Sequence, residues 1–422
     1  MAFVTSTLNP PSNRVPEGTG GSNAPEGFAD RRTSAAGDDV TTNSSSLRNP
    51  VGLYVHIPFC EKKCHYCDFL SKPGSNQQMV DYLELLTKHA SWHQKAVTLD
   101  SVFIGGGTPS ALPVDLLQIL VEKVVGGFEI YPEAEISFES NPESFTLEKA
   151  RILRAGGVNR ISFGNQSTNP EELKRLGRIH TRERATEAFD CARTAGFENI
   201  NIDLIYGFPG HETSSWKRSM SDTIRQNPEH ISAYCFILED ETHFSNLAAT
   251  GSLKELDEDD QADLFELTMN TLRDAGYDPY EISNYAHPGF ECVHNLKYWR
   301  QQEYLGIGLG AVSFIDGSRR SAARSLEEYR RQIHRERHWA WVEEPLERIE
   351  RLKETIMMGL RTQSGVDLDT MAFSPISITE RDQLTDILDP WVDKGLLERN
   401  GSAYTLTARG VFLSNEVFTD LV

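Results

Sequence analysis

The strongest constraint on the fold of this chain is a regular alternation of short β-type runs with helical segments, which starts at Leu53. Strands are predicted at residues 53–57, 101–104, 134–139, 158–163, 199–205 and 230–237, and helices at 77–96, 113–125, 146–155, 182–195 and 213–226. Strands that alternate with helices form a parallel sheet with right-handed crossovers. Six units are too few to close an eight-stranded barrel. We therefore predict an α/β fold with a partial, open (β/α)₆ barrel and place the chemistry at the carboxyl ends of its strands.

Composition and pattern divide the chain into four regions: a disordered tail at 1–48, the barrel at 49–240, an extension of the barrel at 241–322 and a C-terminal domain at 323–422. More than half of the tail is Gly, Ser, Thr, Asn and Pro, and such a composition buries too little apolar surface to fold. The extension is predicted as a long acidic helix followed by a loop to about residue 320. The last region is predicted as helices and a hairpin that turns at Asn400-Gly401, which resembles a winged helix.

The charge of the chain argues against nucleic-acid binding. Lys and Arg number 42 and Asp and Glu number 62, so the formal net charge is −20 and repels phosphate backbones. Residues 321–422 carry 13 basic and 18 acidic side chains, or 13 − 18 = −5, so a DNA-binding winged helix is not expected there. No apolar run reaches the ~20 residues that span a bilayer, and no secretion signal is recognisable. The chain is predicted to be cytoplasmic and without a transmembrane segment, and peripheral membrane contact stays open.

Three of the six cysteines lie at C-x₃-C-x₂-C spacing directly after the first predicted strand, as Cys60, Cys64 and Cys67. Three thiolates on one short loop can each hold one iron of a [4Fe–4S] cluster, which leaves the fourth iron open to a small molecule. Zinc is the competing interpretation, but structural zinc needs four ligands, so His56 or His65 would have to complete the site. The other cysteines are interpreted as buried or incidental thiols: Cys191, Cys235 and Cys292.

The cysteine motif and the string that leads into it, YVHIPFC from Tyr54 to Cys60, resemble the radical S-adenosylmethionine superfamily. Within it, the chain is similar to the subgroup of oxygen-independent coproporphyrinogen III oxidases and HemW haem chaperones, over about residues 51–420. The resemblance implies that S-adenosylmethionine binds the open iron. It also implies that one electron, from a donor such as flavodoxin or ferredoxin, passes through the cluster and cleaves the cofactor to a 5′-deoxyadenosyl radical.

Residues at the ends of the predicted strands match cofactor contacts of that superfamily. The run GGGTP from Gly105 to Pro109 lets the backbone approach a ligand closely, and the resemblance assigns it to the methionine part. Tyr66, between two of the cysteines, is expected to cover the adenine. The predicted contacts to S-adenosylmethionine are Tyr54, Tyr66, Gly106, Gly107, Thr108, Glu139, Gln166, Arg178 and Asp203.

Two features favour the chaperone branch of the subgroup. Phe69 stands where the oxidases have a fourth cysteine, and only the low-complexity tail precedes the first strand. The string HNLKYW from His294 to Trp299 also matches the H-N-x-x-Y-W motif of the HemW family, where it is associated with haem binding. Without the resemblance, a lone His beside Tyr and Trp is more often a packing residue. With it, His294 is the expected axial ligand of haem, and Tyr298 and Trp299 are expected to pack on the porphyrin.

Two positions depart from the family pattern. Asn165 replaces the Val of the family's G-V-Q-S. Val312 replaces the His of G-P-G-A-H-S, and this second change removes a polar group near the expected haem-binding site. The expected function is a haem chaperone that binds a [4Fe–4S] cluster, S-adenosylmethionine and haem and passes haem to an acceptor protein, without coproporphyrinogen oxidase activity. The alternatives are a radical oxidoreductase that acts on a tetrapyrrole and a radical methyltransferase that uses two S-adenosylmethionine molecules.

Overall fold

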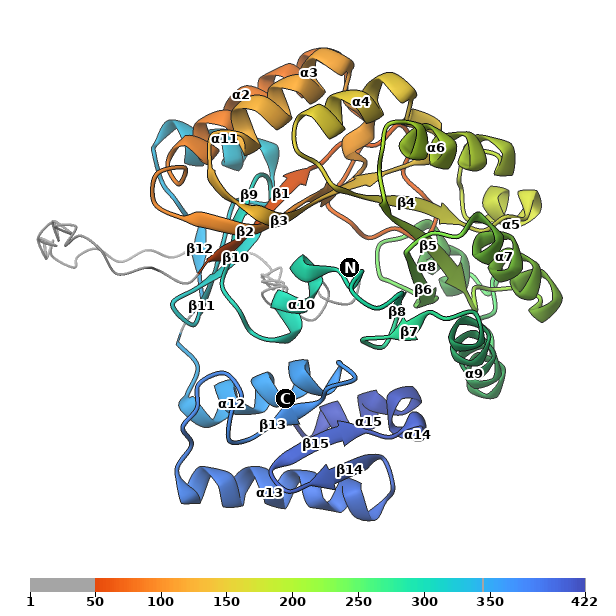
Figure 1. Cartoon of the computed structure of the whole chain (residues 1–422), viewed down its shortest axis with the longest axis vertical. Helices are drawn as coiled ribbons and strands as arrows, with labels where there is room; N and C mark the ends of the chain where they lie inside the picture. Colours follow the sequence, from red (N-terminus) through yellow and green to blue (C-terminus); the bar gives the residue numbers. More distant parts are fainter. Residues whose placement is uncertain (1–49, 344, 422) are drawn as a thin grey trace, which may run out of the picture. The chain divides into compact units, whose positions relative to one another are not determined.

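A computed structural model describes residues 50–343 and 345–421 (Figure 1), so the tail predicted at 1–48 lies outside the described residues. From Pro50 onward the chain forms one compact unit. Its main feature is a run of six parallel strands that lie side by side in chain order. They are β1 (Val51–Ile57), β2 (Thr98–Gly106), β3 (Glu129–Ser140), β4 (Arg160–Gln166), β5 (Asn199–Tyr206) and β6 (His230–Cys235). The predicted α/β fold with six βα units is confirmed.

Helices connect these strands, and Figure 1 shows α2, α3, α4 and α6 along one side of the sheet. The connecting helices are α2 (Asn76–Ser91), α3 (Val114–Ile119), which continues as a π-helical turn (Leu120–Val125), α4 (Leu147–Ala155), α5 (Pro170–Arg175), α6 (Arg182–Thr194) and α7 (Thr213–Gln226). Ser75 and Gln78 form a capping box that starts α2. Gly196, at φ 90°, follows the end of α6, as the sequence predicts.

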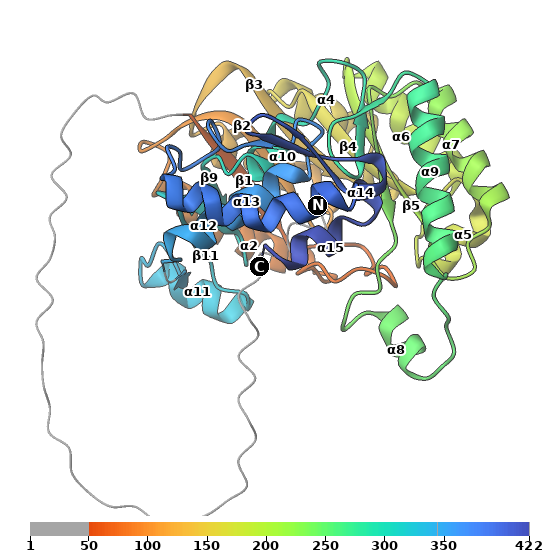
Figure 2. The same ribbon diagram turned by 90° about the horizontal axis from the view of Figure 1, so that it is seen from below.

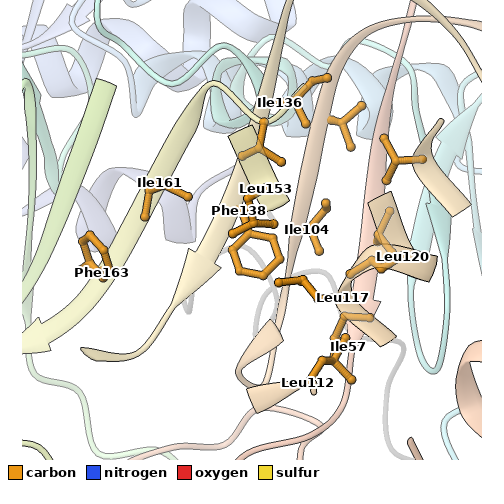
Figure 3. Close-up of a cluster of buried hydrophobic side chains, with 14 of the residues drawn as sticks. Ile57, Ile104, Leu112, Leu117, Leu120, Ile136, Phe138, Leu153, Ile161 and Phe163 are labelled. Carbon is orange, nitrogen blue, oxygen red and sulfur yellow. The ribbon is translucent and has the colours of Figure 1, made fainter. Parts of the chain in front are cut away.

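The strict alternation of side chains along each strand separates the core from the site. Val55 pairs with Ile104, Ile104 with Phe138, and Phe138 with Ile161, so one face of the sheet is apolar from strand to strand. Figure 3 shows Ile104, Phe138 and Ile161 among the buried side chains of this face, with Leu117 and Leu120 from the adjoining helical segment. Neighbouring residues such as Tyr54 point to the opposite face. That second face is polar and carries the candidate site.

The prediction of a loop up to about residue 320 is wrong, because residues 284–321 form several short elements. They are β8 (Asn284–Ala286), α10 (Val293–Trp299), β9 (Tyr304–Ile307), β10 (Val312–Ile315) and β11 (Ser318–Ser321), and the two-residue strand β7 (Asp278–Pro279) precedes them. Strand β9 pairs in parallel with β1, and β8 pairs antiparallel with β6. With the two-residue strand β12 (Trp341–Val342), both edges of the six-stranded array are extended, in the order β12-β11-β10-β9-β1-β2-β3-β4-β5-β6-β8-β7. The short strands were missed because two to four residues are too few to show a period.

The connection between β6 and β7 holds two helices. They are α8 (His243–Ala249) and the acidic α9 (Glu258–Asp274), which agrees with the helix expected near 258–275. Figure 2 shows α8 on the long segment between β6 and α9. Within the described ranges, no helix combines the length and the apolar character needed to cross a membrane.

The C-terminal part has its own sheet and its own core. It contains α12 (Arg348–Leu360), β13 (Val366–Asp367), α13 (Ile378–Asp393), β14 (Leu397–Asn400), β15 (Ala403–Leu406), α14 (Ala408–Phe412) and α15 (Ser414–Thr419). The three strands form a separate antiparallel sheet in the order β13-β15-β14, and a second cluster of buried side chains, from Leu352 to Leu421, surrounds it. These are the predicted helices and hairpin.

Two elements that follow residue 323, the predicted start of the C-terminal domain, belong to the large sheet and its core. Helix α11 (Leu326–His334) packs against α2 through Tyr329, whose hydroxyl lies 3.0 Å from Nδ1 of His89. Strand β12 (Trp341–Val342) pairs with β11 in the large sheet. We therefore propose that the C-terminal domain begins near residue 345, where the second core starts.

Candidate cluster and cofactor site

The cysteine loop leaves the carboxyl end of β1 and is held against the glycine run that follows β2. The amide of Gly107 donates to the carbonyl of Ile57 at 2.8 Å, and the amide of Thr108 donates to the carbonyl of Phe59 at 2.7 Å. A Cβ added at Gly107 would lie 2.8 Å from the Phe59 carbonyl oxygen and 3.0 Å from Cys60 Sγ. Only glycine allows this approach, so the GGGTP run shapes the loop that carries the cysteines.

All six cysteines are free thiols, and the three of the motif lie on this loop. Thr108 Oγ1 donates to Cys60 Sγ at 3.4 Å, and Arg178 Nη1 donates to Cys64 Sγ at 3.4 Å. Burial raises the pKa of Cys60, and it raises the pKa of Cys67 to about 12. Thiolates in such surroundings need a nearby positive charge, which bound iron supplies and Arg178 supplements. The three thiols therefore fit an iron–sulfur cluster.

A single zinc ion and a cubane cluster place different demands on these side chains. Among residues 50–343 and 345–421, no group of three or more His, Cys, Asp or Glu side chains converges to hold one ion. Zinc needs such convergence on one point. In a cubane cluster each thiolate binds a different iron, so the sulfur atoms stand apart.

Glu139 at the end of β3 and Asp203 on β5 place two carboxyl groups at the mouth of the barrel, which is the side where the parallel strands end and the cysteine loop begins. The Gly106 amide donates to Glu139 Oε2 at 3.0 Å, and Asn201 Nδ2 donates to Asp203 Oδ1 at 2.7 Å. Burial and the charge of Asp203 raise the pKa of Glu139 to about 7. Two half-buried carboxyl groups that share a site are suited to a ligand with ammonium or hydroxyl groups.

Arg178 joins the cysteine loop to the ends of three strands. Its Nη2 donates to Asn141 Oδ1 at 2.7 Å and to the Gly164 carbonyl at 2.6 Å. Asn141 Nδ2 in turn donates to Thr108 Oγ1 at 3.0 Å. Asn141 was not singled out by the sequence analysis, because it lies one residue beyond β3 in no recognisable motif.

Gln166 has the backbone and side chain of a ligand-binding residue. It lies in the left-handed region at φ 67°, which is uncommon for a residue with a side chain. Its buried Oε1 has no hydrogen-bond partner within the described part of the chain, and the same holds for Oδ1 of its neighbour Asn165. A bound ligand could pair with Oε1 of Gln166, since Gln166 is the last residue of β4. Asn165, the first departure from the family pattern, offers an additional polar atom there.

Of the two predicted tyrosines, Tyr54 lies on β1 before the cysteine loop and Tyr66 lies within that loop. His56 Nε2 is 2.9 Å from the carbonyl of Leu70 and donates to it, so Nδ1 is an acceptor for the hydroxyl of Tyr54 at 2.9 Å. Burial lowers the pKa of His56 to about 4, which keeps it neutral. Tyr66 packs against an apolar cluster that suits a flat ring: Leu176, Ile205, Phe208, Phe236 and Phe244.

The predicted haem residues are buried inside the barrel, and Tyr298 lies near the cofactor contacts, since burial and neighbouring groups that include Tyr54 and Glu139 raise the pKa of its hydroxyl. His294 is fully buried on α10, with Nδ1 3.0 Å from Ser101 Oγ and Nε2 3.0 Å from the Tyr298 hydroxyl. Ser101 precedes Gly106 by five residues along β2, or about 16 Å at ~3.3 Å per residue. Trp299 is also buried, and the guanidinium of Arg361 lies 5.0 Å from its ring centre. The assignment of these residues to haem stays a prediction.

Helix α10 is fixed in place by a residue that the sequence analysis missed. Glu135 on β3 accepts hydrogen bonds from the amide of Val293 at 3.1 Å, and from the amide of His294 and the thiol of Cys292 at 3.3 Å. Cys292 is buried, as predicted, and burial raises its pKa to about 12. Val312, the second departure, lies on β10 directly after the run Gly308–Gly310 and Ala311. This run packs on the end of β1, because a Cβ on Gly308 would lie 2.7 Å from the carbonyl oxygen of His56.

Comparisons with known proteins agree with this geometry. Residues 54–222 match the model of the radical SAM superfamily, and residues 346–413 match that of the HemN C-terminal domain. The chain is 34% identical to the haem chaperone HemW of Bacillus subtilis (strain 168), over 86% of this chain and 97% of the relative. It is 39% identical to HemW of Escherichia coli (strain K12), over 64% of this chain and 72% of the relative.

A mitochondrial relative and a solved structure extend the comparison. The radical S-adenosyl methionine domain-containing protein 1 of Bos taurus is 31% identical over 74% of each chain. The crystal structure of coproporphyrinogen III oxidase (HemN) from Escherichia coli has a TM-score of 0.75 at 24% identity, covering 88% of this chain and 90% of that one. The structural likeness concerns the fold.

Proposed function

This chain belongs to the HemW family of radical S-adenosylmethionine proteins, and from that membership we propose that it is a haem chaperone. In this proposal it binds a [4Fe–4S] cluster, S-adenosylmethionine and haem, and it delivers haem to an acceptor protein. The observation that carries the cofactor part is the position of Arg178, which donates to Cys64 Sγ at 3.4 Å and to the carbonyl of Gly164, two residues before Gln166, at 2.6 Å. The haem part follows from the family.

The cluster is proposed to be held by Cys60, Cys64 and Cys67. When bound, it would pass single electrons from a flavodoxin- or ferredoxin-type donor to the cofactor. Arg178 and Thr108, each 3.4 Å from one of the sulfur atoms, would donate hydrogen bonds to the thiolates.

S-adenosylmethionine is proposed to lie between the glycine run and the ends of β3, β4 and β5. The carboxyl groups of Glu139 and Asp203 and the amide of Gln166 suit its ammonium and ribose hydroxyl groups, and Arg178 suits its carboxylate. The apolar cluster around Tyr66 suits the adenine ring. The remaining proposed contacts are Tyr54, Gly106, Gly107 and Thr108.

Haem is proposed as cargo rather than as a resident cofactor. The motif assigns haem binding to His294, Tyr298 and Trp299. The iron of haem could bind His294 only if its ring gave up a hydrogen bond to Ser101 or Tyr298. Free thiols at all six cysteines suit a reducing compartment, so we propose the cytoplasm as the location. Phe69 in place of a fourth cysteine disfavours coproporphyrinogen oxidase activity.

The test is an anaerobic titration of the cluster-reconstituted chain with ferric haem, followed at the Soret band, and then mixing with an apo-haemoprotein. We expect saturable binding near one haem per chain and transfer that depends on the chain. If haem does not bind saturably, the chaperone function is refuted. Turnover of coproporphyrinogen III, or substrate-dependent release of 5′-deoxyadenosine, would support an enzyme instead.

A further inference from the structure

His65, between the second and third cysteines of the motif, has the ring orientation of a metal ligand. Its Nδ1 lies 2.8 Å from the carbonyl oxygen of Arg175. A carbonyl only accepts hydrogen bonds, so Nδ1 carries the proton and Nε2 carries the lone pair. Histidines that bind metal almost always donate their other ring N–H to a carbonyl or carboxylate in this way. The side chain is partly exposed, in contrast to the buried ring of His294.

The position of His65 is fixed from both sides by the backbone. Its amide donates to the Leu176 carbonyl at 3.0 Å, and its carbonyl accepts from the Phe244 amide at 3.0 Å. A Cβ on Gly177 would lie 2.7 Å from the ring, so only glycine leaves room for the imidazole there. The ring of His243, at the exposed start of α8, has its centre 4.5 Å from that of His65. A ligand at His65 would therefore bind a side chain that is already held in position.

The surroundings of His65 combine exposed apolar groups with charges of both signs. Ile179 is 46% exposed and follows Gly177 by two residues; Ile237 is 41% exposed and directly follows Phe236, whose ring packs on Phe244 at 5.7 Å. The exposed Lys62 and Lys63 lie on the same loop as His65, beside the exposed Glu61, and the acidic run 239–241 precedes His243. A flat apolar macrocycle with an iron centre and two carboxylates can use the imidazole, the two isoleucines and the two lysines, with its carboxylates turned away from the acidic run.

We propose that haem docks at this rim of the barrel, with Nε2 of His65 as the axial ligand of the iron in place of the motif-based assignment to His294, whose ring is buried with both nitrogens hydrogen-bonded. In this arrangement His243, Ile179 and Ile237 offer apolar contacts to the porphyrin, and Lys62 and Lys63 offer charge for the propionates. The inference rests on the proposed chaperone function, since it takes haem as the cargo. Because His65 directly follows Cys64, the cluster and the haem would be held by the same short loop.

The test compares ferric haem titrations of the cluster-reconstituted wild type, His65→Ala and His287→Ala. His287 is the matched control: its Nδ1 also donates to a carbonyl, that of Gly276 at 2.9 Å, and its ring also stacks on an aromatic side chain, Tyr277. We expect His65→Ala to weaken binding by at least about tenfold and to change the Soret position and the low-spin EPR signals. Imidazole added to His65→Ala should restore the wild-type spectrum, and His287→Ala should bind as the wild type does.

The outcomes separate this inference from the proposed function. Wild-type binding with an unchanged spectrum and affinity in His65→Ala would overturn the assignment while the chaperone function stands. A wild type that does not bind haem would refute both. Iron and acid-labile sulfide are measured in each variant, and a His65→Gln variant replaces His65→Ala if the latter loses its cluster. Loss of the wild-type signals in His294→Ala, with normal signals in the His65 variants, would place the ligand on α10 instead.

Discussion

The backbone amide of Gly106 donates a 3.0 Å hydrogen bond to Oε2 of Glu139. This contact joins the glycine run after β2 to the end of β3 before any cofactor binds. It lowers the pKa of Glu139, but burial and Asp203 outweigh it and raise that pKa to about 7. The carboxyl group is therefore partly protonated near neutral pH in the folded chain.

The first prediction concerns the pH dependence of stability. Because the folded-state pKa of Glu139 is about 7 and its ordinary value is 4.5, the folded chain binds the extra proton between these values. This group thus stabilises the fold at low pH, and its contribution is lost as the pH rises from about 4.5 to about 7. Replacing Glu139→Gln should flatten the curve and stabilise the cofactor-free chain at pH 8 on the order of 2 kcal/mol relative to wild type. Thermal unfolding of both chains from pH 5 to 8 checks this, and parallel curves would contradict it.

The second prediction concerns the cluster. Cys60→Ala, Cys64→Ala and Cys67→Ala should each reduce iron and sulfide per chain to a small fraction of the wild-type content after reconstitution, because each thiolate holds a different iron. Cys191→Ala is the control, since Cys191 lies on α6 outside the loop. Equal iron in the loop variants and the control would show that the motif does not hold the cluster.

The third prediction concerns Arg178, whose guanidinium spans Cys64, Asn141 and the Gly164 carbonyl. Lys keeps the charge but cannot reproduce these forked hydrogen bonds, so Arg178→Lys should weaken S-adenosylmethionine binding by about tenfold. Equilibrium dialysis with the cluster-loaded chain measures the affinity. Arg182→Lys, at a half-exposed ion pair with Asp222, should leave it unchanged. The assignment fails if both variants bind alike.

The fourth prediction treats His294 as a buried packing residue in the haem-free chain. Ser101→Ala would leave Nδ1 of His294 without its partner in a fully buried site, which should lower the free energy of unfolding by about 1–3 kcal/mol. Ser91→Ala, at the exposed end of α2, should change it by less than about 0.5 kcal/mol. Denaturant titrations of both variants check the difference. A neutral Ser101→Ala would mean that the ring of His294 is not held by this contact.

How far the sequence predicts the site depends on how local each feature is. Cys60, Cys64 and Cys67 lie within eight residues, so their spacing alone indicates the cluster. The family resemblance singles out Glu139, Gln166 and Asp203, and the rule that parallel strands end at one edge explains why they lie together. Asn141 reaches Thr108 across 33 residues, and Ser101 reaches His294 across 193, through a register that no local pattern contains.

The fold shows the same division. The six long strands have enough residues to display an apolar period, and their order follows from the crossover rule. Strand β9 has four residues, and nothing in them indicates that they pair with β1. The HNLKYW string singled out residues 294–299 but did not indicate that they form a helix. The amides at the start of this helix are capped by Glu135 on β3, which is far away in the sequence.

The pairing of β9 with β1 also affects the order in which the chain can fold during its synthesis. The strand that leads into the cysteines gains one neighbour from β2, but its other edge stays open until residues 304–307 have left the ribosome. Exposed strand edges invite pairing with other chains, and contacts this distant in sequence form slowly. The nascent chain therefore carries its cysteine loop beside an unpaired edge for most of its translation. A partner that shields this edge, or early assembly of the metal centre, would bear directly on the yield of folded protein.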